Sequence, residues 1–229
     1  MKKVLSMLGL CCFSILLYAQ SKVGLHGVYL AKNGQQNELW LFADGYGSHI
    51  SYENNTYGST YGGPVALTEE GIRITIEYND ANPQEVGQTK NIKAHVKATG
   101  LQIGSLNYIK QVAKKQDLDG LWRITGRKQE DKMSTIKRGD RKTIKLLVDG
   151  YFQWIAINPA EKGFYGTGGG QYSFANGKYV EHILFFSRDN GRVGAKLDFT
   201  GELKNGEWHH SGKSSKGDPI YEIWSRDRE

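Results

Sequence analysis

The sequence predicts an all-β protein built as two tandem, internally duplicated, small antiparallel up-and-down β-barrels. Three observations predict this fold: the composition, the turn dipeptides and an internal repeat. The 229 residues include 29 Gly, 13 Tyr, 8 Phe and 5 Trp but only 4 Pro. Such a composition is typical of a β-rich globule rather than a disordered chain. No amphipathic helical pattern of useful length is found along the chain.

Tight-turn dipeptides separate short apolar segments throughout the second half, at Asp149-Gly150, Asn176-Gly177, Asn190-Gly191 and Asn205-Gly206. Both dipeptide types adopt the positive φ angles that hairpins need, so they predict consecutive antiparallel strands. The predicted strands are 121–125, 143–148, 151–157, 171–174, 179–186, 193–199, 207–210 and 220–224. Eight strands in up-and-down order are enough to close a small barrel.

An internal repeat relates the two halves of the chain. The segment Leu41 to Tyr46 recurs as Leu146 to Tyr151, a shift of 105. Three later matches share a shift of 107: Gly62-Gly63 with Gly169-Gly170, Ile72 to Tyr78 with Tyr179 to Phe185, and Val86-Gly87 with Val193-Gly194. Five matches in one order, counting the similar starts Leu25 to Tyr29 and Leu118 to Trp122, indicate duplication. We expect separable barrels at 20–113 and 117–229, joined within 112–117.

The first 19 residues have the pattern of a cleavable signal peptide. Lys2 and Lys3 precede a short apolar run from Val4 to Leu17, and the small residue Ala19 follows. We expect cleavage after Ala19 and an exported protein, periplasmic or extracellular; an uncleaved anchor is the alternative. Cleavage would remove both cysteines, which excludes a disulfide scaffold, and would lower the formal charge from +6 to +4. No later stretch predicts a transmembrane segment in the mature chain.

Five segments of the second half carry a family resemblance. Gly120-Leu121-Trp122 and the closing strand Tyr221 to Arg226 resemble the lipocalin-type (calycin) barrel. In that family the Trp plugs the closed end and a basic residue near the C-terminus packs across it. Phe152 to Trp154, Gly166 to Gly170 and Trp208 to Lys213 also resemble an uncharacterised family of secreted, lipocalin-like bacterial proteins. The first copy departs from the motif with Gly27-Val28-Tyr29.

One carboxylate is expected inside the second barrel. In the first copy Ile72, Ile74, Ile76 and Tyr78 alternate with polar residues, so they predict the inner face. The shift of 107 then places Tyr179, Glu181, Ile183 and Phe185 inside, with Glu181 in place of Ile74. Burying a carboxylate costs several kcal/mol unless it is paired, so Glu181 is a candidate site residue. Alternatively an Arg or Tyr satisfies it structurally, or a register shift turns it to water.

The opposite face of the same strand carries Val180, His182, Leu184 and Phe186. An apolar outer face needs a cover, which we expect to be the other barrel; a partner surface is the alternative.

The leading hypothesis is a binding protein that holds a small hydrophobic or amphipathic ligand in or at the mouth of the second barrel. The expected ligand-binding residues are Glu181, Tyr179, Tyr165, Tyr172 and His210. One alternative is an extracellular enzyme using Glu181 with His182 or His210 as acid or base. Another is a surface module that binds glycan or protein. No catalytic residue is assigned, because a general base needs a perturbed pKa and a hydrogen-bond partner that a sequence does not reveal. A hydrolase of the Gly-x-Ser-x-Gly type lacks support, because that motif is absent.

Several other motifs do not predict sites. His209 and His210 point to opposite sides of a strand, so no metal site is expected, and no cofactor. Gly212-Lys213-Ser214 lacks the first glycine and the helix of a phosphate loop. The Gly166 to Gly170 run predicts a hairpin loop or barrel lip.

A basic stretch between Arg123 and Lys145 has nine basic and three acidic residues. We expect its loop residues to be solvated, with an acidic ligand or polysaccharide as the alternative. They are Lys132, Lys137, Arg138, Arg141 and Lys142. Nucleic acid is not an expected partner, given the export signal and the modest net charge.

Overall fold

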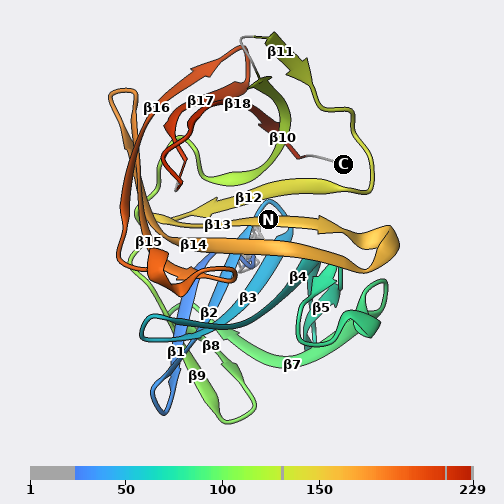
Figure 1. The fold of residues 1–229 in the computed structure, drawn as a ribbon. Coiled ribbons are helices and arrows are strands. Elements are labelled where there is room, and N and C mark those ends of the chain that lie inside the picture. Colours follow the sequence, from blue (N-terminus) through green and yellow to red (C-terminus); the bar gives the residue numbers. More distant parts are fainter. Residues whose placement is uncertain (1–23, 130–131, 215, 228–229) are drawn as a thin grey trace, which may run out of the picture.

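The computed structural model describes residues 24–129, 132–214 and 216–227. It contains two closed, eight-stranded antiparallel β-barrels in tandem, which confirms the predicted fold class. Figure 1 shows the second barrel, coloured yellow-green to red, lying against the first, coloured blue to green. The predicted signal segment and its cleavage point lie outside the described residues. None of the described helices is both long and apolar enough to cross a membrane.

The first barrel closes when its last strand, β9, pairs with its first, β1. Its elements are β1 (Gly27–Asn33), β2 (Gln36–Ala43), β3 (Tyr46–Glu53), β4 (Thr56–Thr68), β5 (Gly71–Thr75), the short β6 (Tyr78–Asn79) beside β4, the 3-10 turn η1 (Pro83–Glu85), β7 (Thr89–Lys97), β8 (Gly100–Ile103) and β9 (Leu106–Lys110).

The second barrel closes in the same way, through the pairing of β18 with β10. Its elements are β10 (Gly120–Gln129), β11 (Lys132–Thr135), β12 (Lys142–Val148), β13 (Tyr151–Asn158), η2 (Pro159–Glu161), β14 (Gly163–Ala175), β15 (Lys178–Phe186), η3 (Asn190–Arg192), β16 (Lys196–Lys204), β17 (Glu207–Lys213) and β18 (Pro219–Arg226). The segment between the barrels runs from residue 111 to 119 and contains the predicted junction.

Three of the four predicted turns have the expected hairpin conformation. Asp149, Asn176 and Asn205 have φ angles of 50°, 51° and 54°, and each precedes a glycine that also has positive φ. The fourth turn differs, because the Asp189 side chain accepts a hydrogen bond from the Gly191 amide and caps the 3-10 turn η3. Strand β16 therefore begins at Lys196, three residues later than predicted.

The glycine run of the second copy is not a loop or barrel lip, as the sequence predicted, but the middle of strand β14. A Cβ atom on Gly170 would lie 2.0 Å from the carbonyl oxygen of His182 on the neighbouring strand. At the equivalent Gly63 a Cβ would lie 1.9 Å from the Thr75 carbonyl oxygen. The repeated Gly-Gly pair is thus required by the close approach of two backbones.

The apolar residues form three clusters. One fills the first barrel around Trp40, Phe42 and Ile74, and one fills the second around Trp122, Phe152 and Trp208. The third lies between the barrels, and both contribute to it: Val28, Leu39, Leu41, Ala43, Tyr46, Ile50, Tyr52 and Tyr78 from the first, and Leu121, Ile144, Leu146, Val148, Ile155, Ile157 and Phe185 from the second. The two barrels therefore share an apolar wall, which we call the inter-barrel core.

A buried polar contact lies at the centre of this wall and follows the repeat. Ser48 and Gln153 are equivalent at the shift of 105, and the Ser48 hydroxyl donates to the Gln153 side-chain oxygen. The Gln153 amide donates to Thr60 Oγ1 at 3.1 Å and to the equivalent Thr167 Oγ1 at 3.0 Å. The duplicated halves thus meet through equivalent faces, as in an isologous dimer. In Figure 1, strands β12 to β14 lie across β2 and β3 at this wall.

The register of β15 corrects part of the predicted inner face. Pairing with β14 passes from Gly169 opposite Phe185 to Gly170 opposite Ile183, so Leu184 is bulged. A bulge reverses the alternation of side chains. Phe185 therefore lies in the inter-barrel core rather than inside the second barrel, and Phe186 packs against the second barrel's interior instead of facing out. Leu184 is covered by the inter-barrel core, as expected for a face packed on the other barrel.

The end of the second barrel has the geometry that the lipocalin resemblance implies. The Arg226 guanidinium lies 3.9 Å from the ring centre of the buried Trp122. In the first copy Lys110 Nζ lies 5.6 Å from the ring centre of Tyr29, which stands where the motif has Trp. The same arrangement of a basic group over an aromatic plug is thus built twice with different residues.

The inter-barrel core predicts that both barrels unfold together. Leu146 is fully buried in this core, so Leu146→Ala should destabilise the protein by about 2 to 5 kcal/mol. Calorimetry should show one transition that moves as a whole, while Leu203→Ala, at a position 42% exposed, should change it little. Two separate transitions, of which Leu146→Ala moves one, would contradict this prediction.

Candidate functional site

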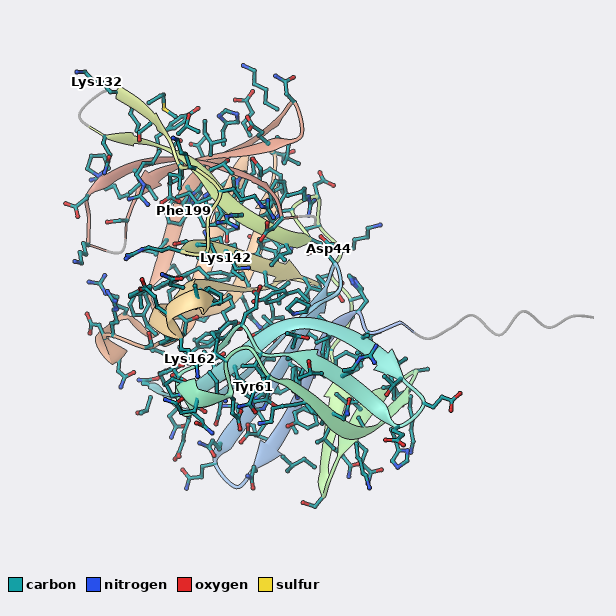
Figure 2. The ribbon with its side chains drawn as sticks, turned by 90° about the vertical axis from the view of Figure 1, so that its right-hand side faces the viewer. Asp44, Tyr61, Lys132, Lys142, Lys162 and Phe199 are labelled. Atoms are coloured by element: carbon teal, nitrogen blue, oxygen red, sulfur yellow. The ribbon has the colours of Figure 1, made fainter. Side chains whose placement is uncertain are left out.

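A cavity of about 230 Å³ lies inside the second barrel. Its wall carries the four ionisable residues Lys145, Glu181, His210 and Glu222, and the aromatic side chains of Trp154, Phe186, Phe199 and Trp224. The hydroxyl residues Thr143 and Ser214 also line it, and both are half-buried. Figure 2 labels Phe199 in the second barrel, and Lys142 on the side toward the first.

Glu181 lies inside the barrel, as predicted, and it is paired. Its Oε1 accepts hydrogen bonds from Lys145 Nζ at 2.8 Å and from the Tyr179 hydroxyl at 2.9 Å. The side chains of the ion pair are each 6% exposed. Burial, and then the charge of Glu181, raises the pKa of Tyr179 well above its ordinary value, so this hydroxyl stays a donor. Glu181 is thus satisfied by a Lys and a Tyr.

Aromatic rings surround the ammonium group of Lys145. Its Nζ lies 5.1 Å from the ring centres of Tyr179 and Trp208, and 5.2 Å from that of Trp224. Cation–π attraction is strongest for desolvated cations. These rings therefore offset part of the hydration that Lys145 loses.

His210 and Glu222 form a second polar pair in the same wall. His210 Nδ1 lies 3.3 Å from Glu222 Oε2, and this oxygen also accepts a hydrogen bond from Trp224 Nε1 at 3.1 Å. Burial alone would raise the pKa of Glu222, but the hydrogen bond from His210 and the charge of Lys145 outweigh it and lower the pKa. Glu222 is therefore an acceptor, so the proton of a neutral His210 is on Nδ1.

The second ring nitrogen of His210 is left without a partner. His210 is 2% exposed, and its Nε2 has no hydrogen-bond partner among the described residues. Burial first, and then the charge of Lys145, lowers the pKa of His210, so the ring is neutral near pH 7. Nε2 is then a buried acceptor whose hydrogen bond is unmade, which is a costly state without a ligand or water.

The first barrel is an internal control for this site. At the positions of Lys145, Glu181, His210 and Glu222 it carries the apolar residues Trp40, Ile74, Ile103 and Leu106, all packed in its own core. Its interior ion pair, His49 with Glu38 at 3.1 Å, occupies positions where the second barrel has Trp154 and Thr143. The fold itself thus requires none of the four ionisable groups.

The other predicted ligand-binding residues lie away from the cavity wall. Tyr179 stands behind Glu181, and Tyr172 donates a hydrogen bond to Asp119 near the Trp122 end. Tyr165 is covered by Arg141, whose guanidinium lies 4.3 Å from its ring centre. Among the five predicted residues, the structure brings Glu181 and His210 to the cavity, with Tyr179 in contact with Glu181.

Lys145 and Glu222 were missed as site residues. In the sequence analysis Lys145 was grouped with the basic stretch, although the shift of 105 makes it equivalent to Trp40 of the first copy. Glu222 lies in the closing strand, where the shift rises to 116 because the last turn of the second barrel is longer. The strand alignment alone contained the signal for Lys145.

Two other residues of the basic stretch form ion pairs. Arg138 pairs with Asp227, and Lys142 Nζ contacts Glu77 of the first barrel at 2.8 Å. Lys142 therefore links the two barrels, whereas Lys132, Lys137 and Arg138 are exposed, as expected for solvated loop residues.

His182 and His209 do not join the cavity. His182 lies on the opposite face of β15 from Glu181, and His209 contacts the Tyr221 hydroxyl at 2.9 Å. Within the described ranges no group of three or more His, Cys, Asp or Glu residues is placed to hold a metal ion.

Comparisons with known proteins give no family assignment. No protein-family model matches this chain, and a search of curated proteins found no match. The likeness to lipocalin-type barrels thus stays an interpretation based on the motifs and the barrel geometry.

The Lys145–Glu181 pair predicts a non-additive response to mutation. Glu181→Leu should destabilise the protein by about 3 to 5 kcal/mol, because it leaves a buried ammonium unpaired. Lys145→Met combined with Glu181→Leu should recover most of that loss, while Ile74→Leu in the first barrel should cost less than about 1.5 kcal/mol. Denaturant titrations of the four proteins measure this, and a double variant as unstable as Glu181→Leu would show that the pair is not the cause.

The lowered pKa of His210 predicts acid sensitivity. The unfolded chain takes up this proton near the ordinary value of 6.5, whereas the folded protein does so at lower pH. The contribution of neutral His210 to the free energy of unfolding is therefore fully present above pH 6.5 and is lost as the pH falls through the folded-state pKa. Free energies of unfolding measured between about pH 7 and pH 5 should fall less steeply for His210→Ile than for the native protein. Equal slopes would mean that His210 does not titrate differently in the two states.

Proposed function

We propose that this chain is an exported binding protein whose second barrel holds a small amphipathic ligand in its interior. The observation that carries the proposal is the replacement of four apolar core residues of one copy by four ionisable residues around a cavity in the other. Buried ionisable groups usually lower the stability of the fold. Their presence around a cavity therefore points to a role other than closing the barrel. The signal-like N-terminal pattern supports export.

The size and chemistry of the cavity support a small ligand. Its volume of about 230 Å³ is below the usual range of drug-sized sites but above that of a cavity that takes up benzene. The apolar walls would cover one ring, and the unpaired Nε2 of His210 would orient a polar group.

An enzyme is the second candidate, and the contact between Glu222 and His210 favours it. A carboxylate on Nδ1 and an unprotonated Nε2, in a histidine that lines a cavity, are the features of a general base. His210, rather than His182, would then act with Glu181, because it shares the cavity wall.

Native mass spectrometry of the full chain purified from its own host tests the binding proposal. A small molecule should co-purify with the native protein and be lost from His210→Ile combined with Glu222→Leu, which restores the equivalent residues of the first copy. The matched control, Ile103→Val with Leu106→Val in the first barrel, should retain it. Retention by the first double variant would contradict this site, and chemical conversion of the molecule that depends on His210 would favour the enzyme.

A further inference from the structure

The described residues of the cavity wall carry an unbalanced charge. Lys145 is compensated by Glu181 at 2.8 Å, which leaves Glu222 as the remaining charge. Glu222 accepts hydrogen bonds from His210 and Trp224, but both donors are neutral groups when His210 is neutral. The charge of Lys145 also reaches the half-buried Glu222, but this one ammonium is shared with Glu181, so the wall keeps one negative charge in excess and a further cation near Glu222 would be favoured.

The polar group that the wall lacks is a donor. In the neutral His210 the Nδ1 proton is directed to Glu222, so Nε2 can accept a hydrogen bond but not donate one. A ligand carboxylate has no proton to offer at neutral pH, and it would add a third negative charge beside Glu181 and Glu222. An anionic ligand therefore fits the wall poorly, even though Lys145 is present.

The apolar part of the wall has four aromatic rings beside three aliphatic side chains, and one of these rings already lies near a cation. The rings of Trp154, Phe186, Phe199 and Trp224 line the cavity, and Trp224 lies 5.2 Å from the ammonium of Lys145. Ring faces attract ammonium groups. The same wall can therefore stabilise a second ammonium, provided that it lies toward Glu222.

We infer that the ligand of the second barrel is a small organic ammonium of about one ring in size, with an N–H that donates to His210 Nε2 and a charge that balances Glu222. This inference rests on the proposed binding function and specifies its ligand class. An ammonium satisfies the unmade hydrogen bond, the surplus negative charge and the aromatic wall together. A neutral alcohol satisfies the first and third, and a carboxylate satisfies the third alone.

Four probes of matched size separate these possibilities: benzylamine as its ammonium ion, benzyl alcohol, benzoate and toluene. Calorimetric titration of the full chain at neutral pH should show the tightest binding for benzylammonium, about tenfold tighter than for benzyl alcohol. Benzoate should bind the most weakly of the polar probes.

The charge argument is tested with Glu222→Gln, which keeps an acceptor oxygen for His210 and Trp224 but removes the charge. The preference for benzylammonium over benzyl alcohol should fall from about tenfold to less than about threefold. Glu202→Gln, which removes the same charge from an exposed position of β16, should leave the preference unchanged.

The outcomes distinguish this inference from the proposed function. Binding of benzyl alcohol or toluene as tight as that of benzylammonium, tightest binding of benzoate, or an unchanged preference in Glu222→Gln would overturn the ammonium inference and leave a binding cavity. Failure of the native protein to bind any of the four probes would overturn both the ligand class and a binding site of this size.

Discussion

The shared wall between the barrels is the constraint on which the rest of the structure depends. Ile144, Leu146 and Val148 of β12 are buried against the first barrel, so the intervening Lys145 can point only into the second. A lysine at an ordinary barrel surface would extend to water, but this one lies in a strand covered on both faces. Its pairing with Glu181 and its contact with aromatic rings follow from that position. The interior chemistry of the second barrel is therefore set in part by packing on its outside.

The duplication separates what the fold needs from what one copy has added. Features present in both copies serve the architecture: the Gly-Gly pair at the strand crossing, the basic group over an aromatic plug, and the threonines that meet at Gln153. The four ionisable residues of the cavity belong to the second copy alone. Their absence from the first copy, which closes the same barrel with apolar side chains, shows that they are not needed for closure.

The sequence predicted most of the fold because its signals are local. Hairpin turns depend on a dipeptide, and the repeat needs no knowledge of contacts, so barrel number and strand order followed from them. The inward direction of Glu181 followed from simple alternation. The predicted inward direction of Phe185 was wrong because of the bulge at Leu184. That bulge depends on how β15 pairs with β14, which is a property of two strands together. Glu222 was missed for a related reason, since its equivalence to Leu106 appears only through the pairing of the last two strands.

The first barrel contributes stability that offsets the energetic cost of the ionisable groups in the second barrel. A domain has a net stability of only about 5 to 15 kcal/mol, and each buried ion loses several kcal/mol of hydration. The buried Lys145 and Glu181 and the half-buried Glu222 therefore lower the stability of the second barrel, and the unpaired Nε2 of His210 lowers it further. Apolar burial at the inter-barrel core contributes stability without occupying the cavity, because its side chains come from the outer faces. A barrel that lacks such a site can therefore stabilise a neighbour that has one, through the wall that they share.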